Sequence, residues 1–368
     1  MSQSQIEIQL VAALVAAACA LPGVFLVLRR VALMSDAISH TVLLGIVIGF
    51  MLVGDLRSPL LIIFAALSGV ITVSLSELLL KTRRVKEDAA IALVFPALFS
   101  IAVIIINRNF GNVHLDADAV LLGELAFAPF NRAEILGANL PKGVWIMGAI
   151  LLLNVVLIGL FYKELKLATF DAALATALGF SPALIHYGLM ASVSVTAVGA
   201  FDHVGSILVI ALMIAPPAAA YLLTDRLSRM LLISVLIGVA AAISGYWLAR
   251  GLNVNISGAM ATMTGVFFMA ALLFAPERGL IARMFQRRQR KSRFATEMLL
   301  VHLNRHERTA EEATENTLSH LIEELRWSES LARQVVGRAE GQGWITRQAD
   351  RLRLTDGGRQ VARRAQDR

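Results

Sequence analysis

The stretch WIMGAILLLNVVLIGLFY, residues 145–162, contains no charged side chain. A charge-free apolar segment of about 18 residues is long enough to cross the hydrocarbon core of a bilayer as a helix. Similar blocks recur along the chain, and 57% of its 368 residues are apolar while only 17% are charged. Soluble domains are about half apolar and about a quarter charged. The sequence therefore predicts an all-α polytopic membrane protein with eight or nine transmembrane helices.

The apolar blocks and the charges between them predict a topology. The expected spans are residues 6–28, 32–53, 58–80, 89–106, 143–162, 183–199, 204–223, 231–249 and 256–274. Their odd-numbered connectors hold 10 Lys and Arg and their even-numbered ones 5. By the positive-inside rule, this bias predicts a multi-pass protein of the inner (cytoplasmic) membrane, with its N-terminus outside and its C-terminal domain in the cytoplasm. Nine crossings fit this alternation, and eight would follow if one block were re-entrant.

Two features that the sequence lacks limit the chemistry of the chain. It has one cysteine, Cys19, which cannot form an internal disulfide or a thiolate metal cage. It also has no G-x-x-x-x-G-K-[ST] phosphate loop. We therefore expect no enzyme activity and no permanently bound cofactor, and ATP hydrolysis would need a partner chain.

The net charge of +7 is concentrated in the C-terminal quarter, where residues 276–368 carry 19 Lys and Arg against 13 Asp and Glu. We expect a transmembrane domain at 1–280, a basic linker at 281–293 that contacts anionic membrane lipid, and a small cytoplasmic domain at 294–368. In this last domain, helical patterns at 294–305, 317–325 and 330–342 precede two short strands at 344–348 and 351–355. Three helices followed by a hairpin is the order of a winged helix-turn-helix.

The second apolar block, ALMSDAISHTVLLGIVIGF at residues 32–50, carries two ionisable side chains, Asp36 and His40. Such groups cost about 2.5–3.5 kcal/mol at the centre of a span, so they indicate function. They are four residues apart and project from one helical face, and Ser35 and Ser39 would widen that polar face. A carboxylate with an imidazole suits a divalent cation such as Mn, Fe or Zn. The alternative is a neutral His hydrogen-bonded to Asp, which joins two helices.

Several separated motifs resemble the manganese/zinc/iron ABC transporter permease family over about residues 8–280. These motifs are GVFLVLRRVALMSDAISHTVLLG (23–45), LLGE (121–124), KELKLATFDAALATALGFSP (163–182) and VGSILVIALMIAPPAAAYLLTDRL (204–227). The resemblance implies that Asp36, His40 and Glu124 lie on a metal pathway. His114, Asp116 and Asp118 form either an acidic entrance or a solvated surface loop. The resemblance also implies that the segment 170–179 contacts the ATPase. The contact residues expected there are Phe170, Asp171, Ala175, Leu178 and Gly179.

The C-terminal domain resembles the DNA-binding domain of metal-dependent repressors. Arg333 and Arg338 lie on its third helix, where a free regulator contacts phosphates. Tethering to a membrane and the acidic Glu329 and Glu340 oppose DNA binding, so nucleic acid is not expected as a partner and a regulatory or subunit-contact role is favoured. His302 and His306 form another pair four residues apart, either as a solvated helix face or as a metal sensor.

The function that the sequence predicts is a permease subunit of an importer for divalent transition metal ions. Its expected partners are an ATP-binding-cassette ATPase, an extracytoplasmic metal-binding protein and a second permease subunit. The alternatives are a stand-alone secondary metal transporter and a membrane-tethered metal-responsive regulator.

Overall fold

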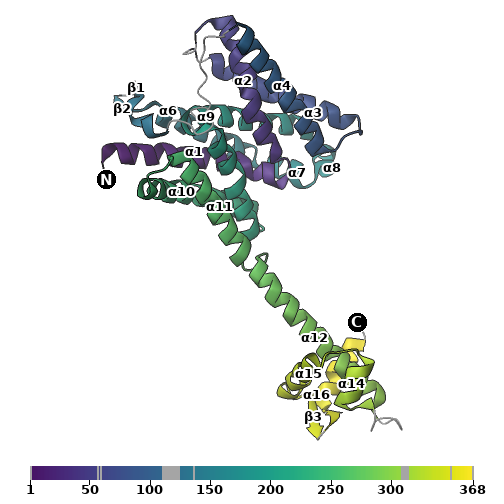
Figure 1. Cartoon of the computed structure of the whole chain (residues 1–368). Coiled ribbons are helices and arrows are strands. Elements are labelled where there is room, and N and C mark those ends of the chain that lie inside the picture. The colour runs from purple at the N-terminus through teal and green to yellow at the C-terminus, as the bar shows by residue number, and fades with distance from the viewer. Residues whose placement is uncertain are drawn as a thin grey trace. The chain divides into compact units, whose positions relative to one another are not determined.

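The computed structural model of the chain describes residues 2–55, 58, 60–109, 125–135, 137–307, 315–348 and 350–366. Two compact units, Met1–Gly279 and Leu280–Arg368, each consist mainly of helices (Figure 1). We refer to them as unit 1 and unit 2.

Unit 1 is a bundle of helices with one small sheet. Its elements are α1 (Gln3–Leu28), α2 (Leu33–Val53), α3 (Leu60–Lys81), α4 (Glu87–Asn109), η1 (Leu125–Phe130), β1 (Arg132–Ile135), β2 (Ala138–Pro141), α6 (Lys142–Leu160), α7 (Tyr162–Phe170), α8 (Ala172–Ala177), α9 (Pro182–Leu223), α10 (Leu227–Leu252) and α11 (Ile256–Phe274). The strands β1 and β2 pair in antiparallel fashion and precede α6 directly.

Eight helices among the described residues are long and apolar enough to cross a membrane. They are α1, α2, α3, α4, α6, α9, α10 and α11. Large apolar side chains on their outer faces are exposed, for example Leu52 at 70% and Leu152 at 64%. Such surfaces would aggregate in water and are stable against lipid. The polytopic membrane fold is therefore confirmed.

The two predicted spans 183–199 and 204–223 form one element, α9, of 42 residues. Its backbone leaves the helical conformation at Gly205, where φ is 76° and ψ is 166°, values that glycine adopts without the penalty of a Cβ atom. The predicted boundaries of these two spans leave a short connector at residues 200–203, with Asp202 and His203 expected as exposed turn residues. That expectation was wrong for His203, which is helical and buried against Gly143 at the start of α6.

Contacts along α9 show that its two halves run in opposite directions. One end of unit 1 contains Glu7 of α1 and Arg132 of β1, which form an ion pair, and α9 approaches this end at His203. The other end contains Arg29, which contacts His186 near the start of α9. The C-terminal end of α10 lines a surface hollow together with Ile8, so α10 begins, and α9 finishes, at the Arg29 end. Each half of α9 therefore extends from one end of unit 1 to the other.

Small residues let the helices of unit 1 pack closely, as is common in membrane bundles. A Cβ atom on Gly23 of α1 would lie 2.1 Å from the Met213 carbonyl oxygen of α9, so only glycine fits there. One buried polar side chain, that of Asn154, also forms hydrogen bonds to two other helices. Asn154 of α6 donates to the Ala18 carbonyl oxygen of α1 and to the Thr196 hydroxyl of α9, and accepts from Ser192. Three helices are thereby joined in the interior.

Unit 2 contains α12 (Leu280–His306), α14 (Leu318–Glu324), α15 (Glu329–Gly341), β3 (Ile345–Gln348), β4 (Arg351–Leu354) and α16 (Asp356–Gln366). Its own core includes Leu299, Leu321, Val335 and Leu352. The segment 281–293, expected to be a separate linker, is the first half of α12, since nothing in its composition breaks a helix. The element order agrees with the sequence pattern, and the identification as a winged helix stays a prediction.

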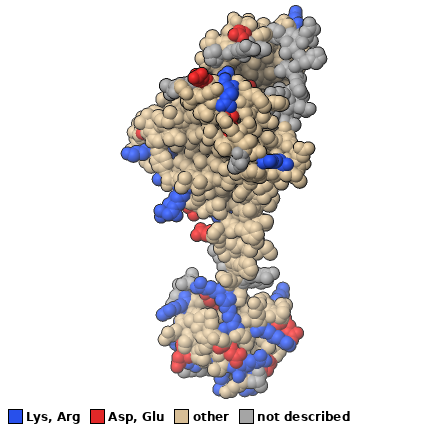
Figure 2. Space-filling model, turned by 90° about the vertical axis from the view of Figure 1, so that its left-hand side faces the viewer, with Lys and Arg blue, Asp and Glu red and all other residues tan. Residues whose placement is uncertain are grey.

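The surfaces of the two units differ in charge. Figure 2 shows Lys, Arg, Asp and Glu crowded over unit 2, whereas most of the visible face of unit 1 carries neither sign. An uncharged belt is typical of a surface that contacts hydrocarbon, and a dense mixture of both charges is typical of a domain in water.

Candidate functional site

Asp36 and His40 form a pair on α2, as their spacing predicted. The Oδ1 atom of Asp36 lies 3.4 Å from Nε2 of His40, one helical turn away. The imidazole stacks on Phe95 of α4 with ring centroids 5.5 Å apart, and Phe99 meets it edge-on at 6.0 Å. These aromatic contacts hold the ring beside the carboxylate, with one oxygen and one nitrogen available to a cation.

The exposure of this pair is informative, because each side chain is 36% exposed on a helix that has no other ionisable residue. A carboxylate and an imidazole turned towards lipid would be costly. The exposed side of the pair is therefore expected to face water or another protein surface. Ser35 and Ser39 do not widen the polar face, contrary to expectation. Both are buried and donate to backbone carbonyl oxygens of their own helix.

Glu124, the third predicted pathway residue, lies outside the described residues, as do His114, Asp116 and Asp118 of the possible entrance. Within the described ranges, no third Asp, Glu, His or Cys completes a metal-ligand group with Asp36 and His40. A transported ion needs only a transient site, and two protein ligands leave positions for water or for ligands from another subunit.

A second polar group, which the sequence analysis missed, lies at the Arg29 end of unit 1. The Arg29 guanidinium donates to the Thr169 hydroxyl at 3.1 Å and lies 3.2 Å from Nδ1 of His186. The other ring nitrogen of His186 lies 2.9 Å from Glu77, which also accepts a hydrogen bond from Tyr187. Burial lowers the pKa of Arg29, yet a guanidinium stays charged at neutral pH.

Glu77 could have been found from the sequence, because it is an ionisable residue inside an apolar block, like Asp36. His186 could not, because it follows the helix start at Ser181 and resembles an interfacial residue in the sequence pattern. The network joins α1, α3, α7 and α9 through side chains alone.

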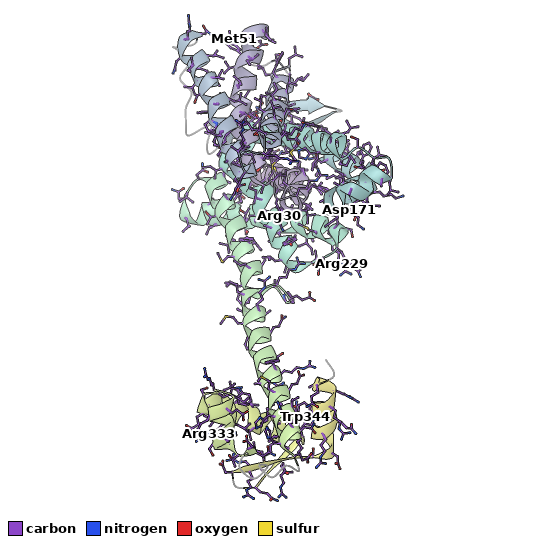
Figure 3. All side chains as sticks on the ribbon, turned by 90° about the vertical axis from the view of Figure 1, so that its right-hand side faces the viewer. Arg30, Met51, Asp171, Arg229, Arg333 and Trp344 are labelled. Atoms are coloured by element: carbon purple, nitrogen blue, oxygen red, sulfur yellow. The ribbon has the colours of Figure 1, made fainter. Side chains whose placement is uncertain are left out.

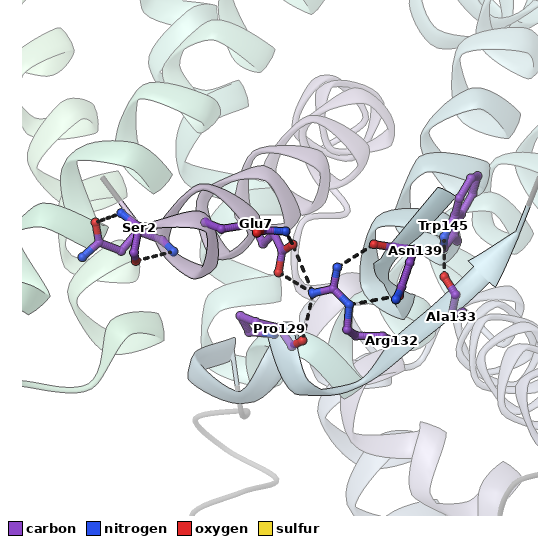
Figure 4. Close-up of polar contacts among 9 residues, drawn as sticks. Ser2, Glu7, Pro129, Arg132, Ala133, Asn139 and Trp145 are labelled. Carbon is purple, nitrogen blue, oxygen red and sulfur yellow. Dashed lines mark hydrogen bonds and ion pairs between the residues drawn. The ribbon is translucent and has the colours of Figure 1, made fainter. Parts of the chain in front are cut away.

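The opposite end of unit 1 is held by an ion pair between the buried Glu7 and the exposed Arg132. Arg132 of β1 donates to both carboxylate oxygens of Glu7, at 2.9 and 3.1 Å, and its Nε donates to the Asn139 side chain of β2 (Figure 4). Glu7 is almost fully buried. The small sheet is thereby fixed to the first turns of α1.

The motif at residues 163–182 forms two short helices, α7 and α8, and the expected ATPase contacts at 170–179 extend from the last residue of α7 to the turn after α8. Asp171 ends the first and caps the second, because its carboxylate accepts from the Leu174 N–H at 2.9 Å. Arg30, Asp171 and Arg229 lie on the side of unit 1 away from Met51 (Figure 3). The segment therefore lies with the basic connectors at one end of unit 1.

This segment presents apolar side chains to its surroundings. Phe170 is 61% exposed and Leu178 60%, and Leu174 and Phe180 are exposed as well. Ala175, which we expected to contact the ATPase, is fully buried, and its carbonyl oxygen accepts from the Phe180 N–H. That expectation was wrong, because Ala175 supports the turn that ends α8. Gly179 forms this turn with a φ of 86°.

In unit 2, the predicted tail residues are held by partners within the domain. Arg333 pairs with Glu329 one turn earlier on α15, and Arg338 donates to the Ser292 hydroxyl of α12 at 3.0 Å. The rings of His302 and His306 lie against each other with centroids 4.7 Å apart. His302 is 8% exposed, so the pair is not a solvated helix face.

Comparisons with known proteins agree on one family. Residues 3–275 match the model of the ABC 3 transport family. The chain is 49% identical over 356 residues to the zinc transport system membrane protein TroD of Treponema pallidum (strain Nichols), covering 97% of both chains. It is 50% identical to the manganese transport system membrane protein MntD of Bacillus subtilis (strain 168), covering 73% of this chain and 92% of the other.

Among solved structures, PsaBC from Streptococcus pneumoniae in complex with Fab is similar to this chain. The TM-score is 0.64 at 26% identity, and the match covers 76% of this chain and 94% of that one. The match to TroD leaves out only about 12 of the 368 residues, so it includes most of unit 2, whereas the family model ends at residue 275.

Proposed function

The chain belongs to the ABC 3 transport family, and from this membership we propose that it is the membrane-spanning permease subunit of an ATP-binding-cassette importer for a divalent transition metal ion. Manganese, zinc and iron are the candidate ions. Relatives are named for zinc and for manganese at nearly the same identity, so similarity does not select among them.

The observation that carries this proposal is the Asp36–His40 pair. A hard oxygen and a borderline nitrogen, side by side on a spanning helix, suit a divalent ion of this class. The stacked Phe95 and edge-on Phe99 restrict the ring, so the ion meets a site that is formed before it arrives. Two protein ligands hold an ion weakly enough to release it, which transport requires.

The partial exposure of the pair supports a second permease subunit. In one chain, the polar atoms of Asp36 and His40 reach the surface of the bundle, where lipid would be costly. A second subunit placed against α2 would enclose them in a path between the two chains.

The α7–α8 segment is the proposed contact for a separate ATPase chain. Its exposed Phe170, Leu174 and Leu178 offer apolar anchors of the kind that fill a groove on a partner. The Arg29 network ties this segment to three spans, so movement of the segment would be passed to the helices.

The two halves of α9 support nine crossings by eight helices, if each half crosses the membrane once. Nine crossings leave the N-terminus and unit 2 on opposite sides. With the basic connectors inside, the end that contains Glu7 and Arg132 faces outwards. An extracytoplasmic metal-binding protein would deliver the ion there.

The experiment that tests this function is uptake by the assembled subunits in proteoliposomes, assayed metal by metal. We expect ATP-dependent accumulation of one or more of Mn²⁺, Zn²⁺ and Fe²⁺ that requires the ATPase and the binding protein. Uptake at the same rate without the ATPase would contradict the proposal and favour a secondary transporter.

A further inference from the structure

Unit 2 contains a cluster of metal-ligating side chains that the transport pathway does not use. Three of the seven histidines of the chain, His302, His306 and His320, lie together with Glu315 and Glu324. They come from the end of α12, the residue range before α14, and α14 itself. Segments separated in the sequence thus bring imidazoles and carboxylates to one place.

The ligand atoms of His302, His306 and Glu315 all lie within 4.8 Å of one another. Ligands bound at about 2.1 Å in a tetrahedral site lie about 3.4 Å apart, so closure needs only small side-chain rotations. Two imidazoles and one carboxylate form a set that suits divalent transition metals and leaves coordination positions for water.

The surroundings of His302 are those of a ligand with an outer partner. One ring nitrogen lies 3.4 Å from the Glu315 carbonyl oxygen, and the other lies 3.7 Å from a Glu324 carboxylate oxygen. If Nδ1 binds an ion, Nε2 has the Glu315 carbonyl oxygen as an acceptor. Glu324 also lies 2.9 Å from Nε2 of His320. Such carboxylate–histidine contacts orient metal ligands and raise their basicity.

Burial and access both favour an ion at this position. His302 is 8% exposed, and its ring is tilted against that of His306 with centroids 4.7 Å apart, so the two imidazoles are held close together inside unit 2. A surface hollow of about 340 Å³, lined in part by His302, His306 and Glu324, provides an entry path.

We propose that His302, His306 and Glu315, supported by Glu324 and His320, form a second metal site, which binds a divalent transition metal ion in unit 2. The proposal does not rest on the transport function, because it concerns binding by unit 2 alone. An ion at this site would join the end of α12 to the segment before α14, and would therefore stabilise the folded unit.

The test uses the full-length protein in detergent, stripped of metal, with Asp36→Ala and His40→Ala in every sample to remove the membrane pair. Equilibrium dialysis against Zn²⁺, Mn²⁺ or Co²⁺ measures ions bound per chain and their affinity. In this background we expect one of these ions to bind in one equivalent. His306→Gln and Glu315→Gln should each weaken that binding by at least about tenfold, since loss of an outer-shell partner alone costs that much.

A matched control distinguishes binding at the proposed site from nonspecific binding of cations to exposed carboxylates. Glu323→Gln changes an exposed carboxylate on the same α14 and should leave binding unchanged. Without metal, the melting temperature of unit 2 should be the same in all variants. Added metal should raise this melting temperature only in variants whose site is intact. Absence of the bound equivalent, or equal loss in Glu323→Gln and Glu315→Gln, would overturn the proposal.

Discussion

The Arg29 guanidinium donates a hydrogen bond of 3.1 Å to the hydroxyl of Thr169, which ties the end of the first span to the last turn of α7. The same guanidinium contacts His186 on α9. One cation is therefore shared by two spanning helices and the proposed ATPase-contact segment. A displacement of α7 cannot leave α1 and α9 unaffected while these bonds persist.

Removing the Arg29 cation should uncouple ATP hydrolysis from metal uptake in the assembled transporter. In Arg29→Ala, hydrogen bonds to a charged group worth about 1.5–3 kcal/mol are lost, so we expect metal uptake per ATP hydrolysed to fall about tenfold or more. The measurement compares uptake with ATPase activity in the same proteoliposomes. Arg30→Asn is the control, because Arg30 is exposed and its φ of 63° is tolerated by asparagine. Equal effects of both changes would show that positive charge, and not the Thr169 contact, matters.

The metal-pathway assignment predicts a loss of transport without a loss of protein. Asp36→Ala and His40→Ala each remove one of two ligands, and we expect uptake to fall to the level of an empty vesicle. Insertion should be normal or better, because removing an ionisable side chain from a spanning helix lowers the cost of insertion. Uptake is measured together with the amount of protein in the membrane fraction. Ser39→Ala, on the same helix and bonded only to its own backbone, should transport normally. Near-normal uptake in both ligand variants would refute the assignment.

The exposed apolar side chains of α7–α8 predict how the ATPase would be contacted. Leu178→Glu places a charge where a groove would bury a leucine, and desolvating that charge is costly. We expect stimulation of the ATPase by the metal-loaded binding protein to be abolished. Leu178→Met keeps an apolar side chain of similar volume and should preserve stimulation. Unchanged stimulation in Leu178→Glu would place the contact elsewhere on the chain.

The shared amide of Asn154 predicts a stability effect in the interior of unit 1. Asn154→Leu leaves the Ser192 hydroxyl and the Ala18 carbonyl oxygen without this partner. Hydrogen bonds between membrane helices contribute about 1–2 kcal/mol, so we expect a loss of this size and a lower melting temperature in detergent. Leu153→Ala, on the outer side of the same helix, should change the melting temperature much less. A melting temperature for Asn154→Leu at or above that of the unaltered protein would contradict this role.

The transmembrane helices and the Asp36–His40 pair could be predicted from the sequence, because both depend on the local order of residues along the chain. Apolar length fixes a span, and a spacing of four fixes a shared helical face. The break in α9 was misplaced because Asp202 and His203 resemble a polar turn, whereas the reversal needs the positive φ of Gly205. No pattern in the local sequence shows that His203 would pack against Gly143 and be buried.

Contacts between distant segments could not be predicted from the sequence. The Arg29 contacts join residues 140 and 157 positions apart, and the Glu7–Arg132 pair joins residues 125 apart. The His302–His306 spacing was visible, but Glu315, His320 and Glu324 approach it only through the folding of unit 2. Ala175 was misassigned because the sequence gives the composition of a segment and not the side that each residue faces.

The arginines of α15 lead to a last prediction, on nucleic acid. Arg333 forms an ion pair with Glu329, and Arg338 donates a hydrogen bond to the Ser292 hydroxyl. A DNA phosphate would have to replace these partners and would lie close to the Glu329 carboxylate. We therefore expect the full-length protein in detergent to retain DNA weakly at about 50 mM salt and not at about 200 mM, because binding through phosphates alone weakens steeply with salt. Mobility-shift titrations at both concentrations measure this, with Arg333→Ala and Arg338→Ala as variants. Retention of one duplex over its scrambled version at the higher salt, lost in both variants, would show that unit 2 reads DNA.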